Sequence, residues 1–348
     1  MHRVAARFLV PFQPSRAAEA RRQWAGTALV VAAVAALASG ACGKKEEAAA
    51  PAGSPPAKRY RFAVMPKALN LPVFTYARVG AERAAKQLGN VDVIWRAPED
   101  ADPLKQKEIL ESFITQGVDG IAISCTSADL LNDPINKAVD AGIPVVTWDS
   151  DAPRSKRLAF WGVDDFKSGQ IMGEEAAKLT GGKGKVALMT SLGAENLARR
   201  LDGVKESLKK HPDMKVVETY DIKEDPTRSA EIIATGMSRY PDLAVWISVG
   251  GWPVFVRNAL DPIDPAKTKF VCFDTVPPAP DLLRSGKVQV LIGQKYFGWG
   301  SEPVKLLAGI KEGRMPQQKV IDSGVDVVTK DNVDAYLEQW KRWEKGEE

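Results

Sequence analysis

Polar side chains directly follow several apolar runs of the sequence, and their types suit hydrogen bonding to hydroxyl groups. Lys67 comes two residues after the run FAVM, Asp149 follows IPVVTW directly, and Asp274 follows KFVCF. Asp151 stands on the same expected loop as Asp149, and Gln294 comes two residues after VQVLI. Carboxylates and amides form paired hydrogen bonds with vicinal hydroxyls, and charge-assisted bonds are the stronger kind. The set therefore favours a site for a neutral polyol, although one carboxylate after a strand is also typical of a helix N-cap.

Two aromatic side chains stand near the same strand ends. Phe74 opens the helix expected after the first strand, and Trp252 follows the run LAVWISV. Such rings can cover the apolar C–H face of a sugar. Core packing is the competing explanation for every aromatic residue, and it is the prediction for Trp95, Trp148 and Trp246, which lie inside expected strands.

Signatures of enzymes are missing from the sequence. The only histidines are His2 and His211, so a histidine-based triad or metal site is not expected. Neither a Gly-x-Ser-x-Gly elbow nor a Gly-Lys-Ser/Thr phosphate loop occurs. Asp149 and Asp151 as a glycosidase pair would stand two positions apart on one loop, a poor placement for flanking a glycosidic bond. The sequence predicts a binding protein without catalytic residues, cofactor or metal.

The elements that must position these residues are short apolar strands that alternate with amphipathic stretches. Expected strands occupy residues 62–65, 91–95, 120–124, 143–148, 185–190, 215–220, 243–249, 269–273 and 288–292. One helix is expected from Phe74 to Leu88, ended by Gly89, and another ends at Gly117. Strands that are apolar throughout indicate a sheet covered on both faces. We therefore predict a doubly wound α/β fold, in which ligands bind beyond the carboxyl ends of parallel strands.

The composition and charge of the chain agree with a globular binding protein of two lobes. The chain has 348 residues, 45% of them hydrophobic, which is enough for two domains or lobes. Its formal net charge of +4 lies at the front: residues 1–41 contain five arginines and one glutamate, so the remainder sums to zero. A neutral folded part argues against nucleic-acid binding.

The front of the chain is typical of an export signal. An apolar run from Trp24 to Leu37 is too short to span a membrane and is followed by Ala38-Ser39-Gly40-Ala41-Cys42. This resembles a bacterial lipoprotein signal over residues 1–41, with Cys42 as the lipidated first residue; Ser39 departs from the usual aliphatic residue. Plain secretion and an uncleaved anchor are the alternatives. Residues 42–58 form an expected flexible tether, and Cys125 and Cys272 are expected to be reduced core residues.

An ordered set of motifs carries a resemblance to a known family. The set includes Asn70 with Pro72-Val73-Phe74, Gln116-Gly117-Val118-Asp119-Gly120-Ile121, Ala141-Gly142-Ile143-Pro144 leading into Asp149, Arg200-Leu201-Asp202-Gly203, Phe273-Asp274, Gln294, and Val328-Thr329-Lys330-Asp331-Asn332. Over residues 59–340 the chain resembles the ribose-type periplasmic sugar-binding proteins of ABC transporters. Met65-Pro66-Lys67 and Thr147-Trp148-Asp149-Ser150-Asp151 are more similar to the rhamnose-binding and autoinducer-2-binding branch.

The resemblance implies two lobes that close over a sugar, joined by crossings near residues 163, 294 and 320. Lobe 1 would comprise residues 59–163 and 295–319, and lobe 2 residues 164–294 and 320–348. By this resemblance Lys67 and Phe74 line the first lobe, Asp149 and Asp151 bind hydroxyls, Arg200 reaches in from the second lobe, and Asp274 and Gln294 lie toward the hinge. Val73, Ser150 and Gly250-Gly251 depart from the ribose binders, so the ligand need not be ribose.

The same resemblance implies the partners. The closed form of a monomeric, lipid-anchored periplasmic or cell-envelope receptor would be recognised by the membrane permease of an ABC transporter. An alternative is a sugar or autoinducer-2 receptor that signals to a membrane sensor. A transcriptional repressor with this effector fold would need an N-terminal helix-turn-helix, and an apolar export segment stands there instead.

Overall fold

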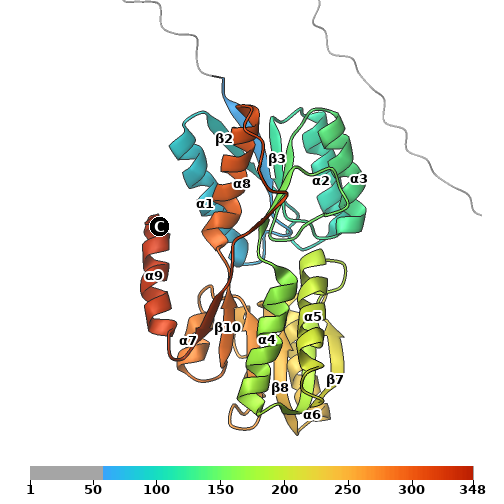
Figure 1. Ribbon diagram of the computed structural model, residues 1–348, viewed down its shortest axis with the longest axis vertical. Helices are drawn as coiled ribbons and strands as arrows, with labels where there is room; N and C mark the ends of the chain where they lie inside the picture. The colour runs from blue at the N-terminus through green and yellow to red at the C-terminus, as the bar shows by residue number, and fades with distance from the viewer. Residues whose placement is uncertain (1–57, 348) are drawn as a thin grey trace, which may run out of the picture. The chain divides into compact units, whose positions relative to one another are not determined.

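The structure, a computed structural model, describes residues 58–347, which form two lobes that are each built on a six-stranded sheet (Figure 1). Helices cover both faces of the first sheet. The predicted signal segment, the lipidated Cys42 and all but the last residue of the predicted tether lie outside the described residues. The prediction of two doubly wound α/β lobes is confirmed.

The sheet of the first lobe is parallel throughout, in the strand order β11-β5-β4-β3-β1-β2. Its strands are β1 (Tyr60–Met65), β2 (Val91–Trp95), β3 (Gly120–Ile123), β4 (Val145–Trp148), β5 (Ala159–Gly162) and β11 (Val320–Asp322). Its helices are α1 (Val73–Leu88), α2 (Pro103–Thr115), α3 (Ala128–Asp140) and α8 (Tyr296–Lys311). Figure 1 shows α1 and α8 on one side of this sheet and α2 and α3 on the other.

The sheet of the second lobe has the order β12-β10-β9-β8-β6-β7, and only β12 runs antiparallel to its neighbour. Its strands are β6 (Lys183–Thr190), β7 (Asp213–Asp221), β8 (Leu243–Ser248), β9 (Lys269–Phe273), β10 (Val290–Gly293) and β12 (Asp326–Thr329). The helices are α4 (Asp165–Thr180), α5 (Glu195–Leu208), α6 (Pro226–Arg239), the short η1 (Trp252–Phe255), α7 (Ala279–Arg284) and α9 (Val333–Lys345).

Local sequence signals explain where several helices begin and end. Asp102 and Asp225 accept hydrogen bonds from backbone N–H groups of the first turns of α2 and α6, and each is followed by a proline at the first helical position. Gly89 ends α1 in the left-handed conformation, as predicted. Because neighbouring strands are parallel in most of each sheet, their carboxyl ends lie at one edge, where the loops that follow them meet.

Alternating side chains of the central strands enter different parts of the core. Phe62 and Val64 of β1 pack with the α1 and α8 side, whereas Ala63 and Met65 pack with Leu110 of α2 and its neighbours. Trp148 and Trp246 are fully buried, as predicted for core residues, whereas Trp95 of the edge strand β2 is only partly buried against the same core. Cys125 and Cys272 are buried and unbonded, which agrees with the prediction that they are reduced.

Within residues 58–347 the chain passes between the sheets three times. It leaves the first sheet between Gly162 and Asp165 and returns to it between Gly293 and Tyr296. The expected boundary at residue 320 lies a few residues too early, because β11 pairs in parallel with β5 in the first sheet. The last crossing therefore falls between Asp322 and Asp326. No helix among the described residues is long and apolar enough to span a membrane.

Candidate functional site

A cleft between the two lobes brings together most of the side chains that the sequence singled out. Of the eight predicted ligand-binding residues, seven line this cleft: Lys67, Phe74, Asp149, Arg200, Trp252, Asp274 and Gln294. The cavity that remains between them is small, about 40 Å³. The lobes are in contact across this cleft.

Lys67 joins the two lobes directly. The residue follows β1, its side chain is almost completely buried, and its Nζ donates to Asn196 Oδ1 at 3.1 Å and Glu224 Oε1 at 3.0 Å. Both partners belong to the second lobe. Neither Asn196 nor Glu224 was predicted from the sequence, although Glu224 stands in the loop after an expected strand, as the predicted residues do.

Asp149 lies at the carboxyl end of β4 in the left-handed backbone conformation, with φ of 58°. Its Oδ2 accepts a hydrogen bond from Ser124 Oγ at 2.6 Å, and its Oδ1 accepts one from Asn196 Nδ2 at 3.3 Å. Burial raises the pKa of Asp149, while the nearby Lys67 and Arg200 act in the opposite direction. A carboxylate has about four acceptor positions, so Asp149 can also accept from ligand hydroxyls.

Arg200 of α5 is held on every side by the protein. Its Nε donates to Asp165 Oδ1 at 2.8 Å, its Nη1 to the carbonyl of Val249 at 3.2 Å and its Nη2 to Gln294 Oε1 at 3.0 Å. The guanidinium lies 3.8 Å from the ring centre of Phe273. These contacts fix Arg200 in one position at the base of the cleft.

Asp274 occupies the equivalent position at the end of β9, also with a positive φ of 74°. Its Oδ1 accepts from Gln294 Nε2 and from the hydroxyl of Tyr296, both at 3.0 Å. Burial raises the pKa of Asp274, while Arg200 and the two hydrogen bonds act in the opposite direction. Gln294 therefore connects Asp274 to Arg200 at the segment where the chain crosses between lobes.

Aromatic rings form part of the cleft wall on both lobes. Phe74 packs against Trp148 and Trp299, with ring centres 5.7 and 5.9 Å apart. Trp252 faces them from the second lobe, and its Nε1 donates to Glu224 Oε2 at 3.3 Å. The indole N–H of Trp299 lines the cleft region but has no hydrogen-bond partner among the described residues.

Asp151 does not line the cleft. Its Oδ1 accepts from Thr147 Oγ1 and from Arg157 Nε, and its Oδ2 accepts from Arg157 Nη2 at 2.6 Å. Arg157 in turn donates to the carbonyl of Lys319, just before β11. The structure thus places Asp151 in a buried ion pair that anchors a hinge segment, because the loop after Asp149 turns back toward β5.

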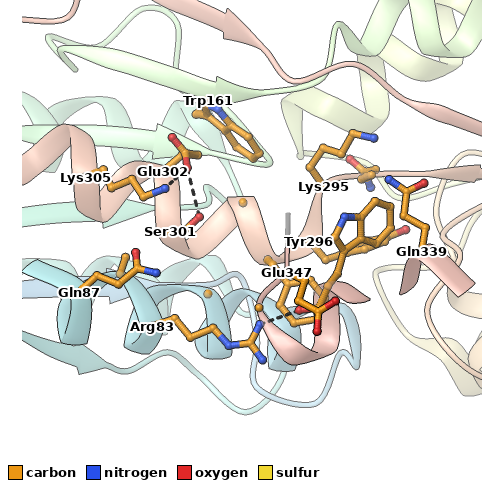
Figure 2. A pocket seen from close by; sticks show the side chains of 17 residues that line it. Arg83, Gln87, Trp161, Lys295, Tyr296, Ser301, Glu302, Lys305, Gln339 and Glu347 are labelled. Carbon is orange, nitrogen blue, oxygen red and sulfur yellow. Dashed lines mark hydrogen bonds and ion pairs between the residues drawn. The ribbon is translucent and has the colours of Figure 1, made fainter. Parts of the chain in front are cut away.

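A larger cavity of about 430 Å³ lies outside the cleft, between α1, α8 and α9 (Figure 2). Of the predicted residues only Gln294 lines it. Arg83 donates to the carbonyl of Trp343, and Ser301 and Lys305 both contact Glu302. Since the strand-end carboxylates of both lobes meet only in the cleft, we place the candidate binding site there.

Comparisons with known proteins agree with this geometry. Residues 62–315 match the model of the periplasmic binding protein domain. The ribose import binding protein RbsB of Salmonella typhimurium is 24% identical over 260 residues, which cover 74% of this chain and 87% of the relative.

Solved structures agree as well. An ABC transporter solute-binding protein from Burkholderia graminis, crystallised in complex with D-arabinose, is 33% identical with a TM-score of 0.75, covering 81% of this chain and 99% of that one. The XylFII–LytSN complex contains a chain that is 25% identical with a TM-score of 0.73, covering 78% of this chain and 98% of that one.

Proposed function

The chain belongs to the family of periplasmic binding protein domains, and from this premise we propose that it captures a sugar or sugar-like polyol between its lobes and delivers it to an ABC import permease. Family membership confirms the resemblance to the ribose-type sugar-binding proteins. It also confirms that the chain is a binding protein and not an enzyme.

The observation that carries the proposal is the convergence of polar groups from both lobes on one cleft. Asp149 comes from the first lobe and Asp274 from the second, and each carboxylate has acceptor positions left for hydroxyl donors. Aromatic rings stand beside them on both walls. A ligand that contacts both lobes shifts the population toward the closed form, without making or breaking a covalent bond.

The remaining features are part of the same proposal. We infer a monomer in the periplasm or cell envelope, exported by residues 1–41 and anchored by a lipid on Cys42. We further propose that the ligand is of the kind bound by the rhamnose-binding and autoinducer-2-binding branch, because the motifs around Lys67 and Asp149 resemble that branch. The B. graminis relative with bound D-arabinose supports a sugar ligand in general.

Signalling to a membrane sensor is the second candidate function. A structural neighbour was solved as the XylFII–LytSN complex, so a protein with this fold forms a complex with another protein. In that case the closed lobes would dock on a sensor instead of a permease, with the same ligand chemistry in the cleft.

A thermal-shift screen tests the binding function. The probes are pentoses, hexoses, deoxyhexoses, polyols and autoinducer-2, because a ligand that binds only the native state raises the melting temperature. At a concentration of about 100 Kd the stabilisation is about 2.7 kcal/mol. The specific hit disappears in Asp149→Ala and persists in Asp140→Ala, a change at an exposed carboxylate of α3. A blank screen with folded protein contradicts the proposal.

A further inference from the structure

Glu224 is an unexpected component of the cleft. It stands in the loop between β7 and α6, and both Lys223 and Glu224 have φ of 55°, in the left-handed region that residues other than glycine rarely adopt. This loop turns the Glu224 side chain inward, so that only 8% of it is exposed. Backbone strain of this kind is concentrated at functional sites and persists because the surrounding structure holds it.

The Glu224 carboxylate spans the cleft. One oxygen accepts from Lys67 Nζ of the first lobe at 3.0 Å, and the other accepts from Trp252 Nε1 of the second lobe at 3.3 Å. Within residues 58–347, the pair of Lys67 and Glu224 is the one ion pair that joins the lobes across the cleft. The two residues belong to different lobes, so this ion pair forms only when the lobes meet. A ligand enclosed by the two lobes would therefore lie next to the Glu224 carboxylate.

The charges around the cleft are unequal in number. Two cations line it, Lys67 and Arg200, against the three carboxylates Asp149, Glu224 and Asp274. All three carboxylates have positive φ, at 58°, 55° and 74°. Lys67 is paired with Glu224, and Arg200 is paired with the buried Asp165 behind it.

Asp149 and Asp274 are therefore left with neutral donors only. The hydroxyl of Ser124 and the amide of Asn196 donate to Asp149, while Gln294 and the hydroxyl of Tyr296 donate to Asp274. Hydroxyl groups of a ligand can donate hydrogen bonds to the acceptor positions that remain on these two carboxylates. An anionic ligand would meet a surplus of negative charge, and taking Lys67 as its partner would leave Glu224 buried without a cation.

We propose that Glu224 is a specificity-determining residue, which together with Asp149 and Asp274 restricts the cleft to uncharged or cationic polyhydroxy ligands and excludes sugar acids and sugar phosphates. This inference rests on the proposed sugar-binding function and narrows its ligand class. Lys67 of the first lobe contributes to the same selectivity, because its positive charge is paired with Glu224 and does not pair with a ligand anion.

Calorimetric titration of the full chain with matched ligands tests the inference. The probes are the ligand that the thermal-shift screen identifies, paired with its phosphate ester, together with D-glucose, D-glucosamine and D-glucuronate, the corresponding galactose set, D-ribose with D-ribose 5-phosphate, and D-arabinose with D-arabinose 5-phosphate. In the wild-type protein the anionic member of the bound set binds at least about 100-fold more weakly than its uncharged parent, since juxtaposed like charges cost several kcal/mol.

Two variants should change the ratio of the affinities for the uncharged and the anionic ligand in opposite directions. Glu224→Gln keeps the shape of the side chain and frees the charge of Lys67, so the preference for the uncharged parent narrows by at least about 10-fold, that is by about 1.4 kcal/mol. Lys67→Gln removes a cation and widens the preference. Glu231→Gln, at an exposed position of α6, leaves the ratio unchanged. Melting curves verify that each variant is folded.

The possible outcomes separate this inference from the proposed function. Equal binding of parent and anion by the wild type, binding of anions alone, or a ratio that Glu224→Gln leaves unchanged overturns the specificity role while sugar binding stands. If no sugar or polyol binds folded protein, either in the thermal-shift screen or in this titration, the proposed function is overturned, and the inference with it.

Discussion

At the scale of single residues, Asp165 illustrates how the site is supported from behind. Its carboxylate is buried beneath Arg200, to which it is bound at 2.8 Å. Burial raises the pKa of Asp165 to about 7, and the Arg200 guanidinium acts in the opposite direction. Above about pH 7 Asp165 is the ionised partner of Arg200, and below that pH the folded protein takes up a proton there while the unfolded chain, with its ordinary pKa of 3.8, is still ionised.

This shift predicts a pH dependence of stability. The contribution of Asp165 is complete below pH 3.8 and is lost as the pH rises toward 7, with a slope of at most about 1.4 kcal/mol per pH unit. Asp165→Asn has no such proton, so the free energy of unfolding should fall less steeply between pH 4 and 7 in the variant. Urea denaturation at several pH values measures both slopes, and identical slopes would refute the raised pKa.

Most site residues could be predicted because the carboxyl ends of parallel strands meet at one edge of the sheet. The same rule placed Asp151 wrongly, since a residue two positions beyond Asp149 is directed by its loop, here toward Arg157. Glu224 was missed because its side chain turns inward only through two consecutive positive φ angles. Periodicity in the sequence carries no information about such backbone torsions.

At the scale of elements, glycine pairs let helices approach backbone to backbone in both lobes. Where α1 meets α8, a Cβ on Gly80 would lie 1.9 Å from the carbonyl oxygen of Phe297. A Cβ on Gly300 would lie 1.8 Å from the carbonyl oxygen of Ala77. In the second lobe, a Cβ on Gly169 or Gly203 would come equally close to backbone of the facing helix, where α4 meets α5. These contacts set the distance between the two helices of each pair.

The α1–α8 contact leads to a prediction with a control in the same helix. Gly300→Ala should lower the free energy of unfolding by about 1–3 kcal/mol or more, because the backbones must separate. Gly309→Ala meets no atom closer than 3.6 Å and should be neutral or stabilising by up to about 1 kcal/mol. Urea denaturation of both variants measures the difference, and equal effects would contradict the close helix packing.

Elements that depend on distant pairing were the ones that sequence analysis missed. The nine predicted strands all occur, with ends shifted by a few residues. By contrast β5, β11 and β12 were not predicted: they are as short as the predicted β3 and β4, and β11 pairs only with β5, across roughly 160 positions of the chain. Short strands of this kind are defined by their partners and not by their own composition, which is also why the last crossing was placed too early.

At the scale of the whole molecule, the two lobes contribute complementary halves of one site. Lys67, Phe74 and Asp149 belong to the first lobe, whereas Arg200 and Asp274 belong to the second. Gln294 lies at a crossing between them and binds both Arg200 and Asp274. On the proposed function, a ligand that contacts both halves would therefore favour the form in which the lobes meet.

The most direct test of this account is a calorimetric titration of the screened sugar into the wild type, Asp149→Asn and Asp274→Asn, with the exposed Asp140→Asn as control. Each hydrogen bond to a charged group contributes about 1.5–3 kcal/mol, so we expect one ligand per chain and a loss of affinity of about 10- to 100-fold from either lobe alone. The control should bind like the wild type. If only one of the two lobes affects affinity, or neither does, the ligand is not held between them and the account is wrong.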